Sequence, residues 1–204
     1  MRQAAAIGVV TFLILAPTTV TPASSQGYST AEAMNLVRSL GESLDMPNEK
    51  VDDLVRNLKS VSADSRYTAL LAGRPVSAVF VYRSTEAGLI YKRRSGHGTI
   101  AFKNTSDQVP LRLSGSSFGA SIGGSAEWGV GLVLGLKENR HFGGNYEGDE
   151  KGATAADSTV PSAARFSNAA YVEAGKAHEV LIIVTARGLS AGVSKAKITL
   201  TPEW

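Results

Sequence analysis

Glycine recurs through a segment that is otherwise typical of β-strands, and this feature constrains the fold more than any other. Twelve of the chain's 21 glycines fall between Gly96 and Gly148, among runs of β-type residues such as Thr99–Phe102 and Val130–Leu136. Glycine weakens a strand, so repeated glycines there mark bulges, sharp bends or the close approach of another backbone. We therefore expect a strongly curved sheet that encloses its own core, a helix or an apolar ligand.

Residues 26–73 carry the periodicity of amphipathic helices. Ser29 and Glu32 have the spacing of a capping box, which predicts that a helix begins there. Asp45 and Pro47 supply a second start signal. Apolar residues then recur at helical spacing, at Val51, Leu54, Val55, Leu58 and Val61. Each apolar stripe must be covered by another element, and the sheet is the available partner.

From Val76 onward the sequence favours strands. We expect them over residues 76–82, 88–93, 98–104, 109–115, 117–127, 130–137, 165–174, 178–186 and 195–201. The run Val180–Val184 is continuously apolar, which indicates burial on both faces. Residues 138–163 form the longest polar interruption, and we expect a loop there. These patterns predict an α+β fold in which N-terminal helices pack on a curved, glycine-rich, mainly antiparallel β-sheet.

The first 25 residues are typical of a secretory signal peptide. Arg2 provides the positive charge, Ala4–Ala16 is a short apolar run, and Ala23–Ser25 offers small residues for cleavage. The apolar run is too short for a transmembrane helix, which needs about 20 residues. No cysteine is present that could form a lipobox. We expect a periplasmic or secreted protein with a helical segment over 26–73 and a β-rich domain over 74–204.

The composition argues against several classes of protein. The formal net charge of +3 is too balanced to indicate a nucleic-acid partner, and no basic run has interleaved aromatics. The lack of cysteine excludes disulfides, thiolate metal sites and cysteine nucleophiles. The histidines His97, His141 and His178 lack metal-ligand spacing, and the acidic group Glu147–Glu150 does not have the spacing of an EF-hand. We expect no metal and no cofactor.

One short motif suggests a hydrolase. Gly115–Gly119 matches G-x-S-x-G, with Ser117 as the nucleophile, and Asp149 or Asp157 and then His178 follow in a suitable chain order. The hydrolase motif requires a strand, a strained turn and then a helix, whereas more glycine-rich strand follows here. We therefore expect no enzyme, and a serine hydrolase stays a remote alternative.

The main basic cluster is Lys92, Arg93 and Arg94, at an expected strand end. One interpretation is a site for lipid phosphates, since each basic side chain near an anionic surface contributes about 1 kcal/mol. The other is a charged strand edge that resists aggregation. Among the aromatics near the glycine-rich region, Trp128 and Phe118 are candidates for contact with acyl chains or the membrane interface.

Four segments, taken in order, resemble the SYLF lipid-binding family. They correspond to its first apolar strand, its Ala-Gly-aromatic step, its glycine-rich centre and its closing motif, at Val76–Tyr82, Ala87–Leu89, Gly96–Phe102 with Ser117–Gly131, and Gly188–Ser194. The resemblance covers residues 70 to 202 and implies an exported lipid-binding domain. The chain departs from the family at Glu86, where a lysine is usual, and at Leu89 and Ser190, where aromatics are usual.

We expect the chain to bind phospholipid at a membrane surface without bond chemistry. The residues expected to contact lipid are Lys92, Arg93, Arg94, Phe118 and Trp128. Two alternatives stay open. The alternating run Lys195–Trp204, which ends on an aromatic, is also compatible with an outer-membrane β-barrel. A structural envelope protein that binds a protein partner fits the sequence equally well.

Overall fold

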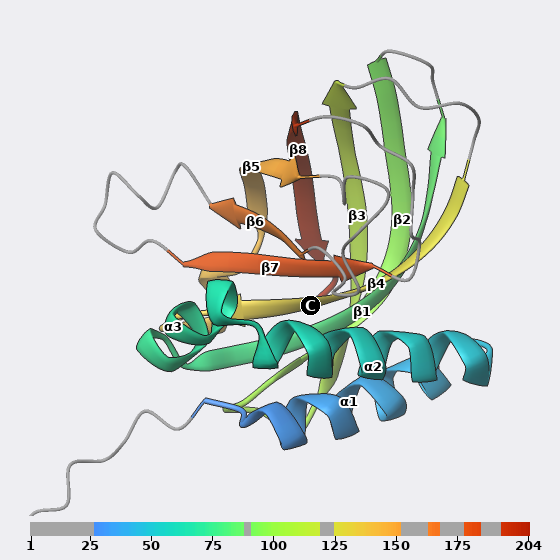
Figure 1. Cartoon of the computed structure of the whole chain (residues 1–204). Helices are drawn as coiled ribbons and strands as arrows, with labels where there is room; N and C mark the ends of the chain where they lie inside the picture. The colour runs from blue at the N-terminus through green and yellow to red at the C-terminus, as the bar shows by residue number, and fades with distance from the viewer. Residues whose placement is uncertain (1–26, 88–90, 119–124, 152–162, 168–177, 185–192) are drawn as a thin grey trace, which may run out of the picture.

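Helices cover one side of a barrel of strands in this computed structural model (Figure 1). The structure describes residues 27–87, 91–118, 125–151, 163–167, 178–184 and 193–204. The expected signal peptide lies outside these residues. The described part of the chain begins with three helices, and the elements described after them are strands and one 3-10 turn, η1 (Asn139–His141).

The helices are α1 (Thr30–Ser43), α2 (Asn48–Ala63) and α3 (Ser65–Gly73). The predicted capping box is confirmed. The Ser29 hydroxyl accepts the amide of Glu32 at 3.2 Å, and the Glu32 carboxylate accepts the amide of Ser29 at 2.7 Å. Two of the amides that the first turn leaves unpaired are thereby satisfied. None of the helices in the described part of the chain is long and apolar enough to cross a membrane.

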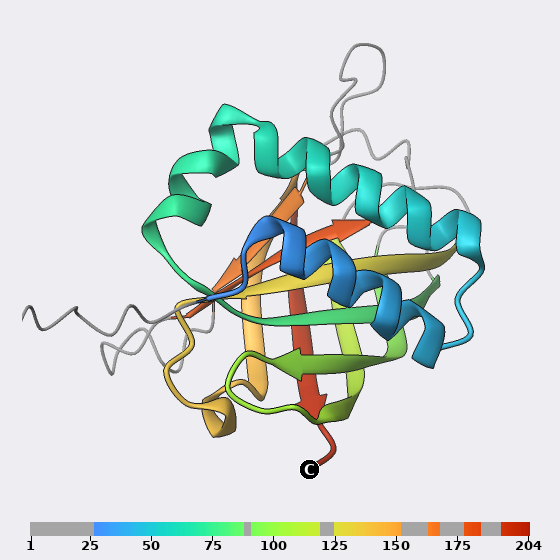
Figure 2. The same ribbon diagram turned by 90° about the horizontal axis from the view of Figure 1, so that it is seen from below.

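The eight strands that the structure describes form one closed antiparallel barrel (Figures 1 and 2). In chain order they are β1 (Val76–Ala87), β2 (Tyr91–Phe102), β3 (Gln108–Phe118), β4 (Ser125–Leu134), β5 (Gly144–Lys151), β6 (Ala163–Ser167), β7 (Glu179–Val184) and β8 (Val193–Pro202). Around the barrel the order is β1-β2-β3-β8-β5-β6-β7-β4, and β4 pairs back with β1. The predicted α+β fold, with helices on a curved antiparallel sheet, is confirmed.

Alternation along the strands separates two apolar cores. On β1, Val79 and Val81 point outward to the helices, whereas Phe80 and Tyr82 point into the barrel. The outer core joins the helices to β1, β4 and β7, over which α1 and α2 lie in Figure 2. On β7, the side chains of Val180–Ile183 alternate between the two cores, which confirms the predicted burial on both faces over these residues. Each large apolar side chain buried in this way stabilises the fold by about 1.5–3 kcal/mol.

Glycines on β4 make room for the aromatic rings of β1. A Cβ atom at Gly131 would overlap the ring of Phe80, and one at Gly129 would overlap the ring of Tyr82. At Gly98 on β2 the obstacle is different, because a Cβ atom there would overlap the carbonyl oxygen of Val81. The expected close approach is confirmed, but on β4 the neighbours are aromatic rings rather than backbone.

The prediction of a loop over residues 138–163 is wrong for the central part of that segment, which forms β5. Tyr146 points into the barrel and is fully buried, while its neighbours Asn145 and Glu147 lie on the outer face and bond to Thr199 and Lys197 of β8. A strand with one solvated face is half polar, so its composition resembles that of a loop. The expected strands 109–115 and 117–127 also differ, since β3 continues to Phe118 and β4 begins at Ser125.

The barrel interior is mainly apolar, with one group of buried charged side chains, and the outer surface that the helices leave uncovered is mainly polar. Its interior core includes Phe80, Ile100, Leu113 and Ile198, all almost completely buried. The exposed positions of β2, β3 and β8 are mostly polar: Tyr91, Arg93, Ser95, His97, Gln108, Pro110, Arg112, Ser114, Lys197 and Thr201. An outer-membrane barrel has the reverse distribution, with an apolar outer band and a polar lumen. The burial pattern therefore does not support that alternative.

Lys103, in the turn between β2 and β3, ties the barrel to the start of α1. Its ammonium lies 2.7 Å from a carboxylate oxygen of Glu32 and 4.7 Å from the centre of the Tyr28 ring. The hydrogen bond from Lys103 is the main reason why the pKa of Glu32 is lowered from 4.5 to about 2, and the capping bonds to Ser29 add to it.

This contact predicts a small acid-dependent loss of stability. Because folding lowers the Glu32 pKa, its contribution is present above pH 4.5 and is lost as the pH falls towards about 2. We expect the melting temperatures of wild type and Glu32→Gln to differ at pH 6 and to converge over that range. Calorimetry from pH 6 to pH 2 measures this, and a pH-independent difference would contradict it.

Candidate functional site

The alternation of β2 divides the basic cluster between the two sides of the barrel wall. Lys92 and Arg94 point inward and are 7% and 8% exposed, while Arg93 between them points outward and is exposed. The sequence prediction placed all three on one lipid-binding surface. The structure corrects this, because adjacent residues of a strand face opposite sides.

Inside the barrel, Lys92 and Arg94 belong to an inner charged cluster with Glu86 of β1 and Glu127 of β4. The Lys92 ammonium lies 3.7 Å from Glu86, and the Arg94 guanidinium lies 3.8 Å from Glu86 and 4.0 Å from Glu127. The Tyr82 hydroxyl donates to Glu127 at 3.0 Å. The cluster thus balances two cations with two carboxylates, as buried charges require. Glu86 stands at a position where the resembled family usually has a lysine, and here it contacts both cations.

Outside the barrel, the same stretch of β2 forms the floor of an open cleft of about 580 Å³. We call it the outer cleft; it is lined by Thr85, Ala87, Tyr91, Arg93, Arg94, Ser95, Ser114, Gly115 and Ser116. These residues come from β1, β2 and β3, which stand side by side in Figure 1. The sequence analysis found Arg93 but missed the tyrosine and the hydroxyl side chains. The register of β2 against β1 and β3, had it been known, would have shown that these residues lie together.

The strand register arranges the cleft in rows across the three strands. Arg93 lies between Ala87 and Ser116, so small side chains flank its guanidinium. Two residues further along β2, Ser95 lies between Thr85 and Ser114, which makes a row of three hydroxyls. Two residues in the other direction lies Tyr91, which is 46% exposed. Along β2, the cleft therefore presents first an exposed aromatic residue, then a cation and then a row of hydroxyl groups.

A further row, Arg83, His97 and Arg112, extends the basic character of this face. The Arg83 guanidinium lies 5.5 Å from the centre of the Trp128 ring, and Arg112 pairs with Glu203 at 2.5 Å. Trp128 is half-buried and packs against the outer core. Its side chain is therefore partly covered, and its contact with lipid stays a prediction. Phe118 ends β3 opposite Tyr91, and its side chain lies outside the described part of the structure.

The residues of the hydrolase motif are not brought together. Ser117 pairs with Lys92 and Ala196 at the cleft end of the barrel, whereas His178 precedes β7 at the opposite end. There the Tyr146 hydroxyl donates to the Phe142 carbonyl, and its oxygen lies 2.7 Å from His178 Nε2. Because the hydroxyl proton is already used, we assign the Nε2 proton as the donor to Tyr146. Asp157 lies outside the described residues.

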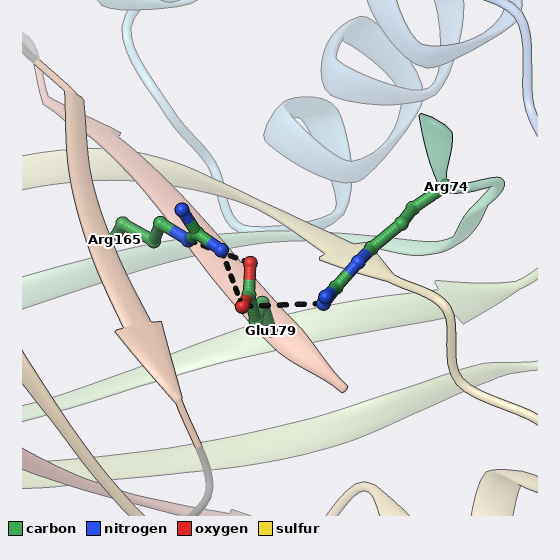
Figure 3. A network of polar contacts seen from close by, with 3 residues as sticks. All are labelled: Arg74, Arg165 and Glu179. Atoms are coloured by element: carbon green, nitrogen blue, oxygen red, sulfur yellow. Dashed lines mark hydrogen bonds and ion pairs between the residues drawn. The ribbon is translucent and has the colours of Figure 1, made fainter. Parts of the chain in front are cut away.

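Figure 3 shows a second ionic network, on the outer face at the same end as His178. The Arg165 guanidinium of β6 donates twice to Glu179 of β7, at 2.6 and 2.5 Å, and Arg74 lies 3.2 Å from the same carboxylate. These hydrogen bonds raise the pKa of Arg165 above its usual value. Arg74 links α3 to β1, so the network ties the end of the helical layer to β6 and β7. Among the described residues, no three His, Asp or Glu side chains converge as metal ligands.

Comparison with known proteins adds little. No protein-family profile matches the chain, and no curated protein matches it. Among solved structures, the crystal structure of a beta-barrel-like, uncharacterized protein from Brucella abortus is similar, with 15% identity and a TM-score of 0.46 over 87% of this chain and 97% of that one.

Proposed function

We propose that this protein is an exported, SYLF-like phospholipid-binding protein that attaches to membrane surfaces through the outer cleft, without bond chemistry. The proposal rests on the positions of two residues of β2 that line the outer cleft. Tyr91 is an exposed aromatic at the barrel rim, and Arg93 lies two residues further along the same strand. Amphipathic rings favour the membrane interface, and guanidinium groups bind phosphate through directed hydrogen bonds.

The charge environment of Arg93 supports this assignment. Within the part of the chain that the structure describes, the lining of the cleft contains no carboxylate, and Arg93 has no ion-pair partner. Lys92 and Arg94, by contrast, lie 3.7–4.0 Å from the carboxylates of the inner charged cluster. Arg93 is therefore the member of the basic cluster that is free to meet an anionic head group.

Co-sedimentation with vesicles tests the proposal. We expect the protein to pellet with vesicles that contain an anionic lipid and to be released by salt, because screening weakens exposed charge pairs. Arg93→Ala should weaken binding about fivefold, the equivalent of about 1 kcal/mol for one basic side chain. Arg140→Ala is the matched control, since Arg140 is an exposed arginine in η1, outside the cleft.

Two results would refute the proposal. The first is that the protein stays in the supernatant at low salt, and the second is that Arg140→Ala weakens binding as much as Arg93→Ala. A protein partner in the cell envelope would then become the leading hypothesis. Export has its own measurement: the N-terminus of the protein recovered from the periplasm or medium should be Gln26, and an intact Met1 would contradict cleavage.

A further inference from the structure

We infer that the outer cleft selects phospholipids whose head group is a polyol, such as glycerol, over equally charged lipids whose head group carries an ammonium. This inference rests on the proposed function and specifies its ligand. It follows from the order of the groups along β2 and from the chemistry of the cleft lining.

The three levels of the cleft follow the order of the parts of a phospholipid. Tyr91 lies nearest the rim, Arg93 comes next, and the hydroxyl row lies furthest from the rim, at Thr85, Ser95 and Ser114. Successive levels are two residues apart, which is about 6.7 Å along a strand. A lipid whose interfacial region contacts Tyr91 and whose phosphate contacts Arg93 would direct its head group to the hydroxyl row.

Hydroxyl groups are suited to another polyol. Each serine or threonine hydroxyl can donate one hydrogen bond and accept others. The Thr85 hydroxyl donates to the Ser95 carbonyl at 3.5 Å, so it offers a ligand an acceptor, while the Ser95 and Ser114 hydroxyls can both donate and accept. The three side chains come from adjacent strands about 4.8 Å apart, which spreads them across the width of a small polyol. Thr85 and Ser114 are exposed, as is Ser95 between them, so the row faces the cleft.

The same lining offers little to an ammonium group. Among the described residues that line the cleft, none is a carboxylate, and the single aromatic ring, Tyr91, lies two residues from the guanidinium of Arg93. Glu86 and Glu127 point to the other side of the wall and engage Lys92 and Arg94. An ammonium head group that reached the hydroxyl row would exchange part of its hydration for neutral hydroxyl groups without gaining an opposite charge.

Binding of the full protein to two kinds of vesicle, with equal mole fractions of phosphatidylglycerol or phosphatidylserine in phosphatidylcholine, tests the inference. Both lipids carry one net negative charge, so Arg93 should contribute equally to the binding of both vesicles. We expect at least about fivefold tighter binding to phosphatidylglycerol, which corresponds to roughly one additional hydrogen bond. The double variant Ser95→Ala/Ser114→Ala should lose this preference and retain its binding to phosphatidylserine. Thr201→Ala removes an exposed strand hydroxyl outside the cleft lining and should change neither.

The outcomes separate the inference from the proposed function. Equal binding of wild type to both vesicles would overturn the polyol preference and leave phospholipid binding intact. Absence of binding to either vesicle would overturn both. A preference that persists in the double variant would show that the hydroxyl row is not its source. Competition by soluble head groups identifies the recognised group, because both kinds of vesicle would occupy the same cleft. Glycerophosphoglycerol should displace the protein from vesicles at a lower concentration than glycerophosphoserine does, and equal potency of the two would oppose head-group recognition.

Discussion

Replacing Gly131 with alanine is expected to destabilise the protein by about 3 kcal/mol, at the upper end of the usual cost of overpacking a core. A Cβ atom at this position would overlap the distal edge of the Phe80 ring. Phe80 is fully buried and contacts Tyr82 and Phe142, whose ring centres lie 6.1 and 6.0 Å away. These neighbours restrict the movement of the ring away from an added methyl group. Urea denaturation followed by circular dichroism measures the change.

A matched substitution separates this steric effect from the general consequences of losing a glycine. At Gly73, the end of α3, a Cβ atom would meet no other atom within 4 Å, so Gly73→Ala should change stability by less than about 1 kcal/mol. The double variant Gly131→Ala/Phe80→Leu should be more stable than the sum of the two single effects predicts, because a smaller side chain at position 80 makes room for the methyl group. Strict additivity would contradict the proposed overlap.

Replacing Glu179 with glutamine is expected to cost about 2 kcal/mol. Removing one partner of a buried ion pair costs about 3–5 kcal/mol, but Arg165 and Arg74 have side chains 53% and 38% exposed, so water recovers part of that energy. The carboxylate itself is buried and receives three contacts from two guanidinium groups (Figure 3). Its loss leaves two positive charges facing each other between β6 and the helical layer.

Glu138→Gln is the control, because Glu138 also pairs with an arginine at hydrogen-bonding distance. Arg140 contacts it at 2.6 Å, but both side chains are largely exposed, and pairs of that kind contribute about 0–1 kcal/mol. Urea midpoints with unchanged m-values should therefore fall clearly for Glu179→Gln and barely for Glu138→Gln. Similar shifts in the two variants would mean that burial of the Glu179 carboxylate has no energetic consequence.

The basic cluster shows how far sequence reasoning could go towards a site. The charges of residues 92–94 are visible in the sequence, and so is the strand that carries them. Which of them meets solvent depends on strand register, because a shift by one residue moves every side chain to the other face. Register is set by the pairing of Arg93 with Ala87 and Ser116, which belong to the two neighbouring strands. Only the folded barrel shows that Arg93 points outward. It also shows that the two cations beside it, at positions 92 and 94, form ion pairs with Glu86 and Glu127 inside the barrel.

The local elements of this protein can be predicted from short stretches of its sequence. The capping box at Ser29, the helical periodicity and the apolar run of β7 are short-range patterns, and neighbouring residues suffice to express them. The tertiary structure alone decided that the sheet closes, that Gly129 and Gly131 accommodate rings from another strand, and that β5 is a strand rather than a loop. Each of these depends on contacts between segments far apart in the chain, and the energy of such contacts is fixed by packing, which no local pattern encodes.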